Sequence, residues 1–283
     1  MEKRHIEEHF YKILMMLSAA VVVASLGLIL ATVFIKGLPA LKLDMLIKTP
    51  QGGYYIGKGG GILNAIVGSL VLGLGATFLA LLVSLPVVFY LHLYLRRNSK
   101  RAVAVRFFLD VLWGIPSIVY GAFGFTIMMF FGLPASLLAG IITVALLIIP
   151  IMSRSMDEVM RMIPFELTET CFALGSTRWE TATKVIFRQA LPGIVTAILI
   201  AFGRGIGDAA SVLFTAGFTD SLPYSLFKPV ATLPLAIFFQ LGTPFPEVQD
   251  RGYASALVAT MIVLFISIIS RFLSKRFTKN IVK

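Results

Sequence analysis

The sequence predicts an all-α membrane protein with six transmembrane helices, and its composition, apolar runs and charge distribution all favour this class. Of the 283 residues, 58% are hydrophobic and 14% are charged, and the mean hydropathy is +0.90. A soluble domain is typically about half apolar and about a quarter charged. A helix that crosses a bilayer needs roughly 20 apolar residues, so the number of such runs sets the number of spans.

Six apolar runs define the expected spans. They cover residues 13–35, 62–95, 107–131, 135–152, 191–218 and 253–272. The first run is longer than the apolar region of a secretory signal, about 7–15 residues, so we expect an uncleaved span. Pro86 and Pro116 lie inside the second and third runs, and neighbouring helices in a bundle can tolerate such prolines. The glycine-rich segment 36–60 and the turn at 132–134 are expected loops.

The basic residues predict the orientation. With the N-terminus inside, 18 of the 25 Lys and Arg residues fall in inner segments, six fall in outer loops, and Arg204 lies within a span. Short cytoplasmic loops carry an excess of Lys and Arg. We therefore expect both termini, and the polar segment 153–190, on the cytoplasmic side.

Composition and motifs argue against several other classes. The net charge of +11 comes from clusters between apolar runs, so it does not indicate nucleic-acid binding. A single cysteine, Cys171, excludes an internal disulfide and a multi-cysteine metal site. The segment HIEEH places His5 and His9 in a pattern used by one class of zinc peptidases, yet no third ligand is evident. We interpret it as a polar N-terminal tail and expect no metal site.

The most informative cytoplasmic segment is ELTETCFALGSTRWETATKVIFRQALPGI, residues 166–194. A helix is expected to end near Leu174, with Gly175 free to adopt positive φ. Thr177 and Glu180 have the spacing of a capping box for a second helix, and Pro192 is expected to break the segment as it enters the fifth span. From local physics alone, this hairpin either docks a partner or lies on lipid headgroups.

The same segment resembles the EAA loop of ABC-transporter permeases, which reads Glu-Ala-Ala, three residues, Gly, nine residues, Ile, one residue, Leu-Pro. Glu169 stands at the Glu position and Gly175 at the Gly position, with their spacing intact. Thr170 and Cys171 replace the two alanines, and a Leu-Pro occurs four residues late. The resemblance implies that Glu169, Ala173, Leu174 and Gly175 belong to a coupling helix that sits in a groove of the ATPase.

Four further segments are similar to phosphate-importer permeases. They are GGGILNAIVGS (59–69), GIPSIVYG (114–121), GRGIGDAASVLFTAG (203–217) and YASALV (253–258), although the family normally has Glu where this chain has Asp208. The short N-terminal region resembles the PstA-type subunit more than its PstC-type sister. We accordingly expect residues 1–58 to form a tail, first span and outer loop, and residues 59–283 to form the permease domain with its coupling segment at 153–190.

This resemblance implies a type I ABC importer architecture and an alternating-access pathway for inorganic phosphate. The implied partners are a PstC-type sister permease, two copies of an ATPase, an extracytoplasmic phosphate-binding protein and the lipid bilayer. No Walker-type G-x-x-x-x-G-K-[ST] occurs, so ATP and Mg would be handled by the ATPase and this chain would need no cofactor. The expected location is the bacterial or archaeal inner membrane.

Two charges are predicted inside the fifth span. A charge in a bilayer costs about 2.5–3.5 kcal/mol on insertion scales and usually faces a bundle interior or a water-filled path. Arg204 and Asp208 are four residues apart and would share a helix face, as a simple salt bridge or in a functional role. Because arginine presents a planar fork to phosphate oxygens, we hypothesise that Arg204 contacts the cargo. Asp208 would orient Arg204 or pair with the sister subunit.

Three smaller features complete the candidate sites. Gly203 and Gly207 form a G-x-x-x-G pair that suits close helix packing, or flexibility during gating. Ser117 could offer its hydroxyl to the pathway or to backbone groups freed by Pro116. Asp110 is expected to pair with Arg106 one helical turn back.

Two alternatives differ in function. A permease for another solute, such as sulfate or molybdate, keeps the architecture and changes only the cargo. An intramembrane enzyme would need convergent catalytic groups at one depth. Arg204 and Asp208 are the only strongly charged candidates deep in a span, and no nucleophile–base pair or metal set joins them, so we expect no catalytic residues.

Overall fold

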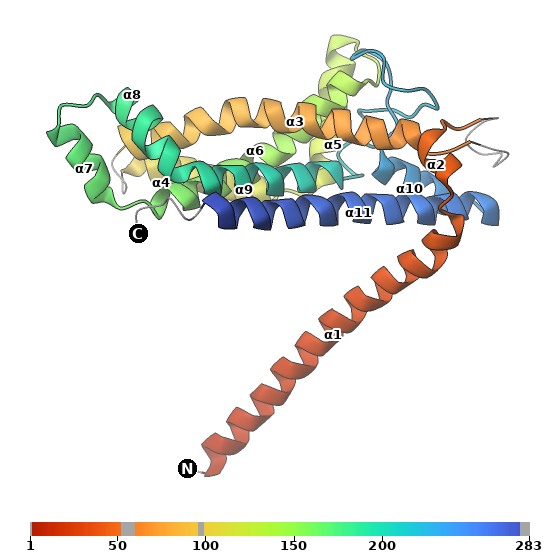
Figure 1. Ribbon diagram of the computed structural model, residues 1–283, viewed down its shortest axis with the longest axis horizontal. Helices are drawn as coiled ribbons and strands as arrows, with labels where there is room; N and C mark the ends of the chain where they lie inside the picture. Colours follow the sequence, from red (N-terminus) through yellow and green to blue (C-terminus); the bar gives the residue numbers. More distant parts are fainter. Residues whose placement is uncertain (1, 52–59, 96–98, 278–283) are drawn as a thin grey trace.

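Helices account for all regular secondary structure in the residues that the computed structural model describes, namely 2–51, 60–95 and 99–277. Most lie side by side in an elongated bundle (Figure 1). Their bounds are α1 (Glu2–Ala40), α2 (Leu43–Ile47), α3 (Leu63–Phe89), π-helical η1 (Tyr90–Tyr94), α4 (Lys100–Gly114), α5 (Ser117–Phe131), α6 (Leu137–Arg161), α7 (Phe165–Ala173), α8 (Arg178–Glu180), π-helical η2 (Thr181–Ile186), α9 (Phe187–Ile206), α10 (Leu233–Leu241) and α11 (Pro246–Phe277). The all-α membrane fold is thus confirmed.

The number of spans is five, or six when a bent pair of helices is counted as one. The five straight candidates are Glu7–Ala40, Leu63–Tyr94, Leu137–Arg161, Arg178–Ile206 and Pro246–Leu273. The expected third span, 107–131, is not one helix, because α4 and α5 meet at an angle of 96°. Pro116 lacks an N–H and disfavours helical backbone at the residue before it, and Ile115 is accordingly extended (φ −71°, ψ 129°).

The core lies between α3, α6 and α9. Small residues at the contacts, such as Ala76 and Ala80 on α3 and Ala201 on α9, are completely buried with Val144 and Ile148 of α6. Without a hydrophobic drive between helices in lipid, close packing of small residues is a main source of association. The core therefore sets the positions from which loops and helix ends project.

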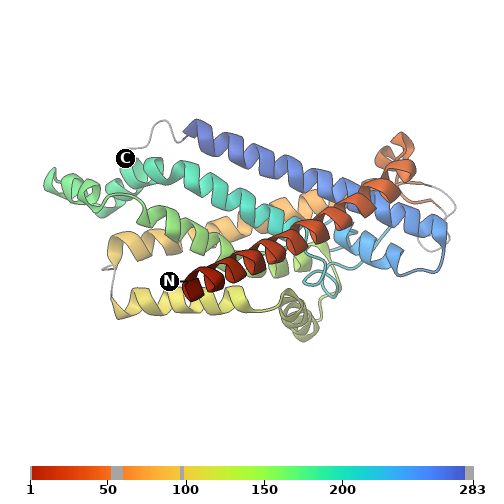
Figure 2. The same ribbon diagram turned by 90° about the horizontal axis from the view of Figure 1, so that it is seen from below.

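Helix α1 leaves the bundle and is joined to it at only one end (Figures 1 and 2). None of its apolar window is buried in the described structure. At the junction, Lys36 Nζ lies 3.3 Å from the Tyr253 hydroxyl and 4.7 Å from the centroid of its ring. A Cβ on Gly37 would come within 2.8 Å of the Tyr253 carbonyl oxygen, so a glycine is needed where α1 meets α11. The predicted division at residue 58 lies outside the described residues.

The two ends of the bundle differ. Helices α7 and α8 project at one end of the bundle, and α2 and α10 lie at the other (Figure 1). Helix α11 ends at the α7–α8 end, and the first residues of α1 lie on that side of the molecule. At the α10 end, the Ser69 hydroxyl accepts a 2.7 Å hydrogen bond from the Leu233 N–H, which links α3 to the start of α10. Part of the expected basic cluster, Arg96 and Arg97, lies outside the described residues.

Two expectations about α9 are wrong. Pro192 does not break the segment, because α9 runs through it, and Pro192 itself is buried between Ala190 and Ile194. A proline removes one backbone hydrogen bond, and the packing of this face outweighs that loss. The helix also ends at Ile206, well before the expected limit at residue 218, so Asp208 lies outside the helix.

Candidate functional site

The hairpin α7–α8 is built from local signals. Helix α7 follows Pro164 and ends at Ala173, with Leu174 as its C-cap, after which Gly175 adopts φ +82°. The Gly175 N–H donates to the Phe172 carbonyl oxygen and the Ser176 N–H to the Cys171 carbonyl oxygen, each at 3.0 Å. This pair of bonds is the Schellman motif, which satisfies the last carbonyl groups of a helix and favours glycine at the left-handed position. The predicted role of Gly175 as a helix terminator is confirmed.

The second helix begins at the predicted capping box. The Thr177 hydroxyl oxygen accepts from the Glu180 N–H at 3.2 Å, and the Thr177 N–H donates to Glu180 Oε2 at 3.1 Å. Lys184 Nζ donates to Glu180 Oε1 at 3.1 Å. These reciprocal bonds start the helix without help from the bundle.

The hairpin presents a large apolar surface. No residue of α7 is buried, and Leu174, Trp179 and Phe165 are 81%, 68% and 63% exposed. Glu169, Ala173, Leu174 and Gly175 all lie on this exposed element. Nothing in the described chain lies within 4 Å of the position that a Cβ of Gly175 would occupy. The structure thus brings the four residues together on a surface that another protein could cover.

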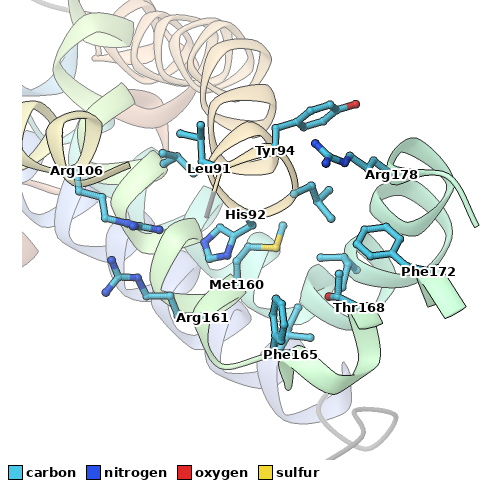
Figure 3. Close-up of a pocket in the computed structure, with 14 residues that line it drawn as sticks. Leu91, His92, Tyr94, Arg106, Met160, Arg161, Phe165, Thr168, Phe172 and Arg178 are labelled. Atoms are coloured by element: carbon cyan, nitrogen blue, oxygen red, sulfur yellow. The ribbon is translucent and has the colours of Figure 1, made fainter. Parts of the chain in front are cut away.

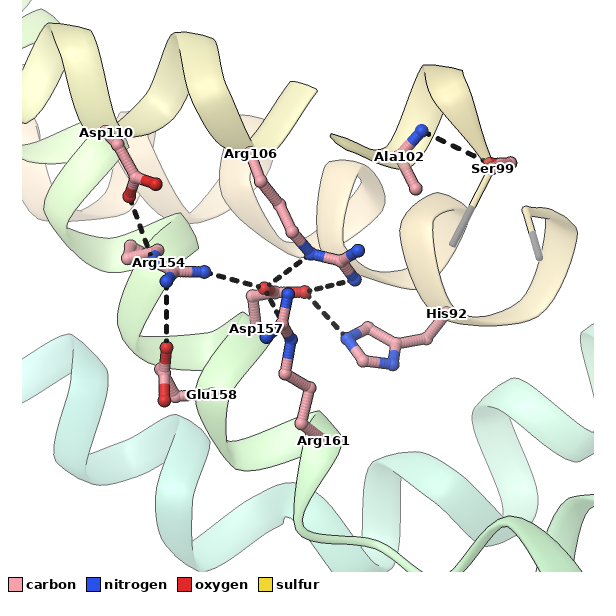
Figure 4. A network of polar contacts seen from close by, with 9 residues as sticks. All are labelled: His92, Ser99, Ala102, Arg106, Asp110, Arg154, Asp157, Glu158 and Arg161. Carbon is pink, nitrogen blue, oxygen red and sulfur yellow. Dashed lines mark hydrogen bonds and ion pairs between the residues drawn. The ribbon is translucent and has the colours of Figure 1, made fainter. Parts of the chain in front are cut away.

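A buried cluster of charges is centred on Asp157 of α6 (Figure 4), and three of its members, His92, Arg106 and Arg161, line a pocket shared with the hairpin. The Asp157 side chain is completely buried and lies within 3.2 Å of three arginines and one histidine. Arg106 donates to it from α4 at 2.9 and 3.1 Å, and His92 Nε2 in η1 lies 2.8 Å from Oδ1. Arg154 and Arg161 pair with it from its own helix. Buried charges need partners, and here the partners join three separate elements.

This cluster corrects the expected pairing of Asp110 with Arg106. Asp110 instead forms an ion pair with Arg154 at 3.0 Å, while Arg106 binds Asp157. Helices α4 and α6 pack side by side, so partners across the helix interface compete with those on the same helix. The sequence does contain a signal for this cluster: Arg154, Asp157, Glu158 and Arg161 recur at i, i+3, i+4 and i+7, the spacing of one helix face.

Arg204 and Asp208 lie near each other at the end of α9. Arg204 is in the last turn with its side chain 51% exposed, whereas the Asp208 side chain is 5% exposed. Their closest approach, Nη2 to Oδ1, is 3.7 Å, too long for a hydrogen bond. Asp208 Oδ2 accepts a 2.8 Å bond from the Ser211 N–H, so this carboxylate caps the turn that follows α9. Neither residue therefore lies in the middle of a helix, as was expected: Arg204 is in the last turn of α9 and Asp208 lies beyond its end.

Ser117 is the first residue of α5 and is half-buried. Its helix reaches the turn after Asp208, because a Cβ on Gly121 would lie 2.8 Å from the Ala210 carbonyl oxygen. In the described part of the chain, the Ser117 hydroxyl makes no hydrogen bond with Arg204 or Asp208. Helix α5 thus lies beside the residues that follow Asp208, but the Ser117 hydroxyl is not bonded to Arg204 or Asp208.

Comparison with known proteins decides the family. Residues 76–283, well over half of the chain, match the family model described as the binding-protein-dependent transport system inner membrane component. The chain belongs to this permease family. The permease is therefore a multi-pass protein of the inner membrane and a transport component, which sets aside the alternative of an intramembrane enzyme.

Phosphate transport system permeases from several bacteria are similar to most of the permease. It is 34% identical over 250 residues to the phosphate transport system permease protein PstA of Xylella fastidiosa, spanning 87% of this chain and 84% of that protein. The PstA protein of Haemophilus influenzae is 33% identical over 86% of this chain and 85% of its own. PstA 2 of Mycobacterium tuberculosis is 30% identical over 90% and 83%.

Solved structures share the fold of the permease. A chain of the inward-facing MetNI methionine ABC transporter has a TM-score of 0.62 at 19% identity, over 76% of this chain and 95% of that one. A chain of an amino acid ABC transporter has a TM-score of 0.56 at 18% identity, over 76% and 92%. The expected ABC importer permease architecture is confirmed at the level of fold.

The predicted glycine pair of the permease makes no close packing contact with another helix in the described part of the chain. A Cβ on Gly203 would meet nothing within 4 Å, and one on Gly207 would meet only the Gly203 carbonyl oxygen at 3.4 Å. Gly205, between them, makes the close approach instead, since its Cβ would lie 3.0 Å from Val144 of α6. Because α9 turns Gly205 toward α6, its two neighbours face away. Close packing at Gly203 and Gly207 would therefore have to involve atoms outside the described part of this chain.

No metal cluster is found among the described residues of the permease, counting groups of three or more His, Cys, Asp or Glu. His9 Nδ1 lies 3.2 Å from the carbonyl oxygen of His5, and His5 Nδ1 lies 3.8 Å from Glu8 Oε2. Both contacts are local to the exposed start of α1.

Proposed function

We propose that this chain is the permease subunit of an ATP-driven importer and forms, with a sister permease, the pathway for inorganic phosphate. The assignment of phosphate as the cargo rests on the sequence identity of 30–34% to phosphate transport system permeases, which extends over most of this chain and of each relative. The alternative cargo, sulfate or molybdate, keeps the same architecture, so a transport assay must decide between them.

The hairpin α7–α8 is proposed as the element that couples the permease to a separate ATPase. Its apolar residues are exposed, and Gly175 leaves room for a close approach. We assign the docking surface to Glu169, Ala173, Leu174 and Gly175. Two ATPase copies would bind ATP and Mg, close together, and move the hairpins so that access to the pathway alternates between the two sides.

The proposed orientation places the hairpin end of the bundle in the cytoplasm. Helix α1 begins toward this end and α11 ends at it (Figure 1), so both termini would be cytoplasmic. The excess of Lys and Arg in these segments supports that orientation. The opposite end, with α2 and α10, would face an extracytoplasmic phosphate-binding protein.

Arg204 is proposed as the residue that contacts phosphate in the pathway. Its half-exposed guanidinium in an apolar bundle would cost several kcal/mol against lipid, which favours a water-filled path or a subunit interface. Asp208 is buried and held by Ser211. Its position favours orienting Arg204 over pairing with a sister subunit. Ser117 remains a candidate for the same pathway on the neighbouring helix α5.

The test is ATP-driven uptake of radiolabelled phosphate into vesicles that hold this chain with its sister permease, ATPase and binding protein. The parent, Arg204→Ala and Arg204→Lys are compared, each with and without excess sulfate. A hydrogen bond to a charged group contributes about 1.5–3 kcal/mol, so we expect Arg204→Ala to lose roughly tenfold or more of the uptake rate. Lysine, which lacks the planar fork, should restore only part of it.

A matched control is Arg271→Ala, which removes an exposed arginine from α11 and should leave uptake near the parent value. Uptake that sulfate does not reduce supports phosphate as the cargo. Absent phosphate uptake, or uptake abolished by sulfate, would contradict the cargo while leaving the permease fold intact. Full uptake by Arg204→Lys would contradict the bidentate role.

A further inference from the structure

A pocket of about 540 Å³ lies between the hairpin and the end of the bundle (Figure 3). It is lined on one side by η1 and the end of α6, and on the other by α7 and α8. Its location is distinct from the Arg204 region at the other end of α9. Occupancy of the pocket therefore concerns the contact between the hairpin and the bundle.

One wall of the pocket is basic. His92, Arg106, Arg161 and Arg178 line it, and no Asp or Glu does so among the described residues. Asp157, behind the wall, neutralises part of the charge of Arg106 and Arg161. Arg178 has no carboxylate partner in the described part of the chain and lies 5.4 Å from the centroid of the Tyr94 ring. The pocket thus retains an unneutralised positive charge at its rim.

The remaining lining is largely apolar. Leu91, Met160, Phe165 and Phe172 are among these residues (Figure 3). A water molecule occupies about 30 Å³, and pockets for drug-sized molecules measure about 300–1,000 Å³. The space is therefore larger than a small ion needs, and its chemistry suits an anion joined to an apolar group.

The surroundings of the pocket match the depth of lipid headgroups. Tyr90 and Tyr94 are about half exposed, with stacked rings whose centroids are 5.9 Å apart. Trp179 on the hairpin is 68% exposed. Trp and Tyr are enriched where a membrane meets water, and basic pockets between transmembrane helices bind anionic headgroups. Exposure of Tyr94, Phe165 and Phe172 leaves the rim accessible from outside.

We propose that this pocket binds a phosphate group at its basic wall, with the headgroup of an anionic phospholipid as the source that its apolar lining favours. Arginine matches phosphate oxygens in a bidentate way. The phosphate would lie between Arg178 on the hairpin and His92 and Arg161 on the bundle, with acyl carbons against the leucines and phenylalanines. Such a ligand would hold the hairpin to the bundle whatever cargo the pathway carries.

The experiment uses the complete assembly of permeases and ATPase in detergent, with a phosphatidylglycerol that carries a photoactivatable diazirine in its acyl chain. After illumination, peptide mapping locates the cross-links. We expect labelling of the peptides that line the pocket, on η1 and α7. A basic residue near an anionic membrane surface contributes enough attraction that Arg178→Gln should weaken labelling about fivefold. Thr168→Trp should abolish it by filling the pocket.

The matched control is Arg188→Gln, an exposed arginine near the same end that does not line the pocket, and it should label like the parent. Size-exclusion chromatography verifies that each variant assembles. Millimolar inorganic phosphate distinguishes the two sources. Labelling that resists phosphate assigns the site to the lipid headgroup, whereas labelling that phosphate displaces assigns it to the free anion.

Two results would overturn the proposal. One is equal labelling in the parent, Arg178→Gln and Thr168→Trp. The other is labelling that appears only in assemblies that lack the ATPase, since the ATPase would then cover the pocket. Neither result depends on transport. The proposal of phosphate as the cargo can therefore be rejected while the proposal of a lipid site in the pocket is kept, and the lipid site can be rejected while the cargo is kept.

Discussion

The hairpin and the Asp157 cluster lie at the same end of the bundle and are built in opposite ways. In the hairpin, the bonds that shape the turn join residues at most five positions apart, such as Ser176 with Cys171 and Thr177 with Glu180. In the cluster, Asp157 binds Arg106 and His92, which are 51 and 65 positions away. The hairpin is exposed and the cluster is buried. An element held by local bonds can bind a partner without unfolding the bundle, whereas the cluster joins three elements of the bundle to one another.

The largest expected effect comes from Asp157→Asn. Removing one member of a buried ion cluster leaves uncompensated charge and costs about 3–5 kcal/mol, and here three arginines lose a carboxylate. We expect the free energy of unfolding in detergent, measured by denaturant titration, to fall by that amount.

The matched control for this variant is Glu158→Gln on the same helix. The Glu158 side chain is 59% exposed, and within the described part of the chain it pairs only with Arg154, so its loss should cost at most about 1 kcal/mol. Equal losses for the two variants would show that burial does not separate these carboxylates.

An intermediate effect is expected from Gly193→Ala in α9. A Cβ at this position would overlap the Val159 side chain of α6, and overpacking of this kind costs about 1–3 kcal/mol. The comparison is Gly203→Ala on the same helix, where a Cβ meets nothing within 4 Å. Because alanine favours helix over glycine by up to about 1 kcal/mol, Gly203→Ala should leave the stability of the chain unchanged or slightly raised.

Thermal unfolding of the isolated chain measures its stability, and co-purification of the sister permease measures subunit association separately. If Gly203→Ala reduces co-purification while the chain stays stable, the glycine packs against another subunit. A loss of stability in Gly203→Ala alone would contradict the open position of this residue.

The smallest effect on stability is expected from Gly175→Ala in the hairpin. A left-handed backbone costs a residue with a Cβ roughly 1–2 kcal/mol, and this strain is confined to the turn. We expect faster hydrogen exchange at the Ser176 amide, with the global free energy of unfolding unchanged. Gly175→Asn, which tolerates left-handed backbone better, should exchange more slowly than Gly175→Ala. A global loss of stability would show that the hairpin is tied to the bundle more strongly than its contacts indicate.

Local features were the ones that could be predicted without the structure. Gly175 and the Thr177–Glu180 box depend on bonds within a few residues, so spacing and residue type sufficed. The predicted Asp110–Arg106 pair was wrong because the neighbouring helix α6 supplies a partner for each residue, Arg154 for Asp110 and Asp157 for Arg106. The predicted end of α9 was wrong because the apolar run continues past Ile206, so hydropathy alone gave no sign of the helix end. In the structure the carboxylate of Asp208 accepts from the Ser211 N–H and favours a turn.

By itself, the sequence determined the membrane class, the helical content, the permease resemblance and the shape of the hairpin, since apolar length and short-range bonds are properties of a chain segment. Only the tertiary structure decided the departure of α1 from the bundle, the cluster around Asp157 and the pocket beneath the hairpin. Each of these depends on which distant segments lie side by side. In helices that are apolar on nearly every face, periodicity carries little of that information.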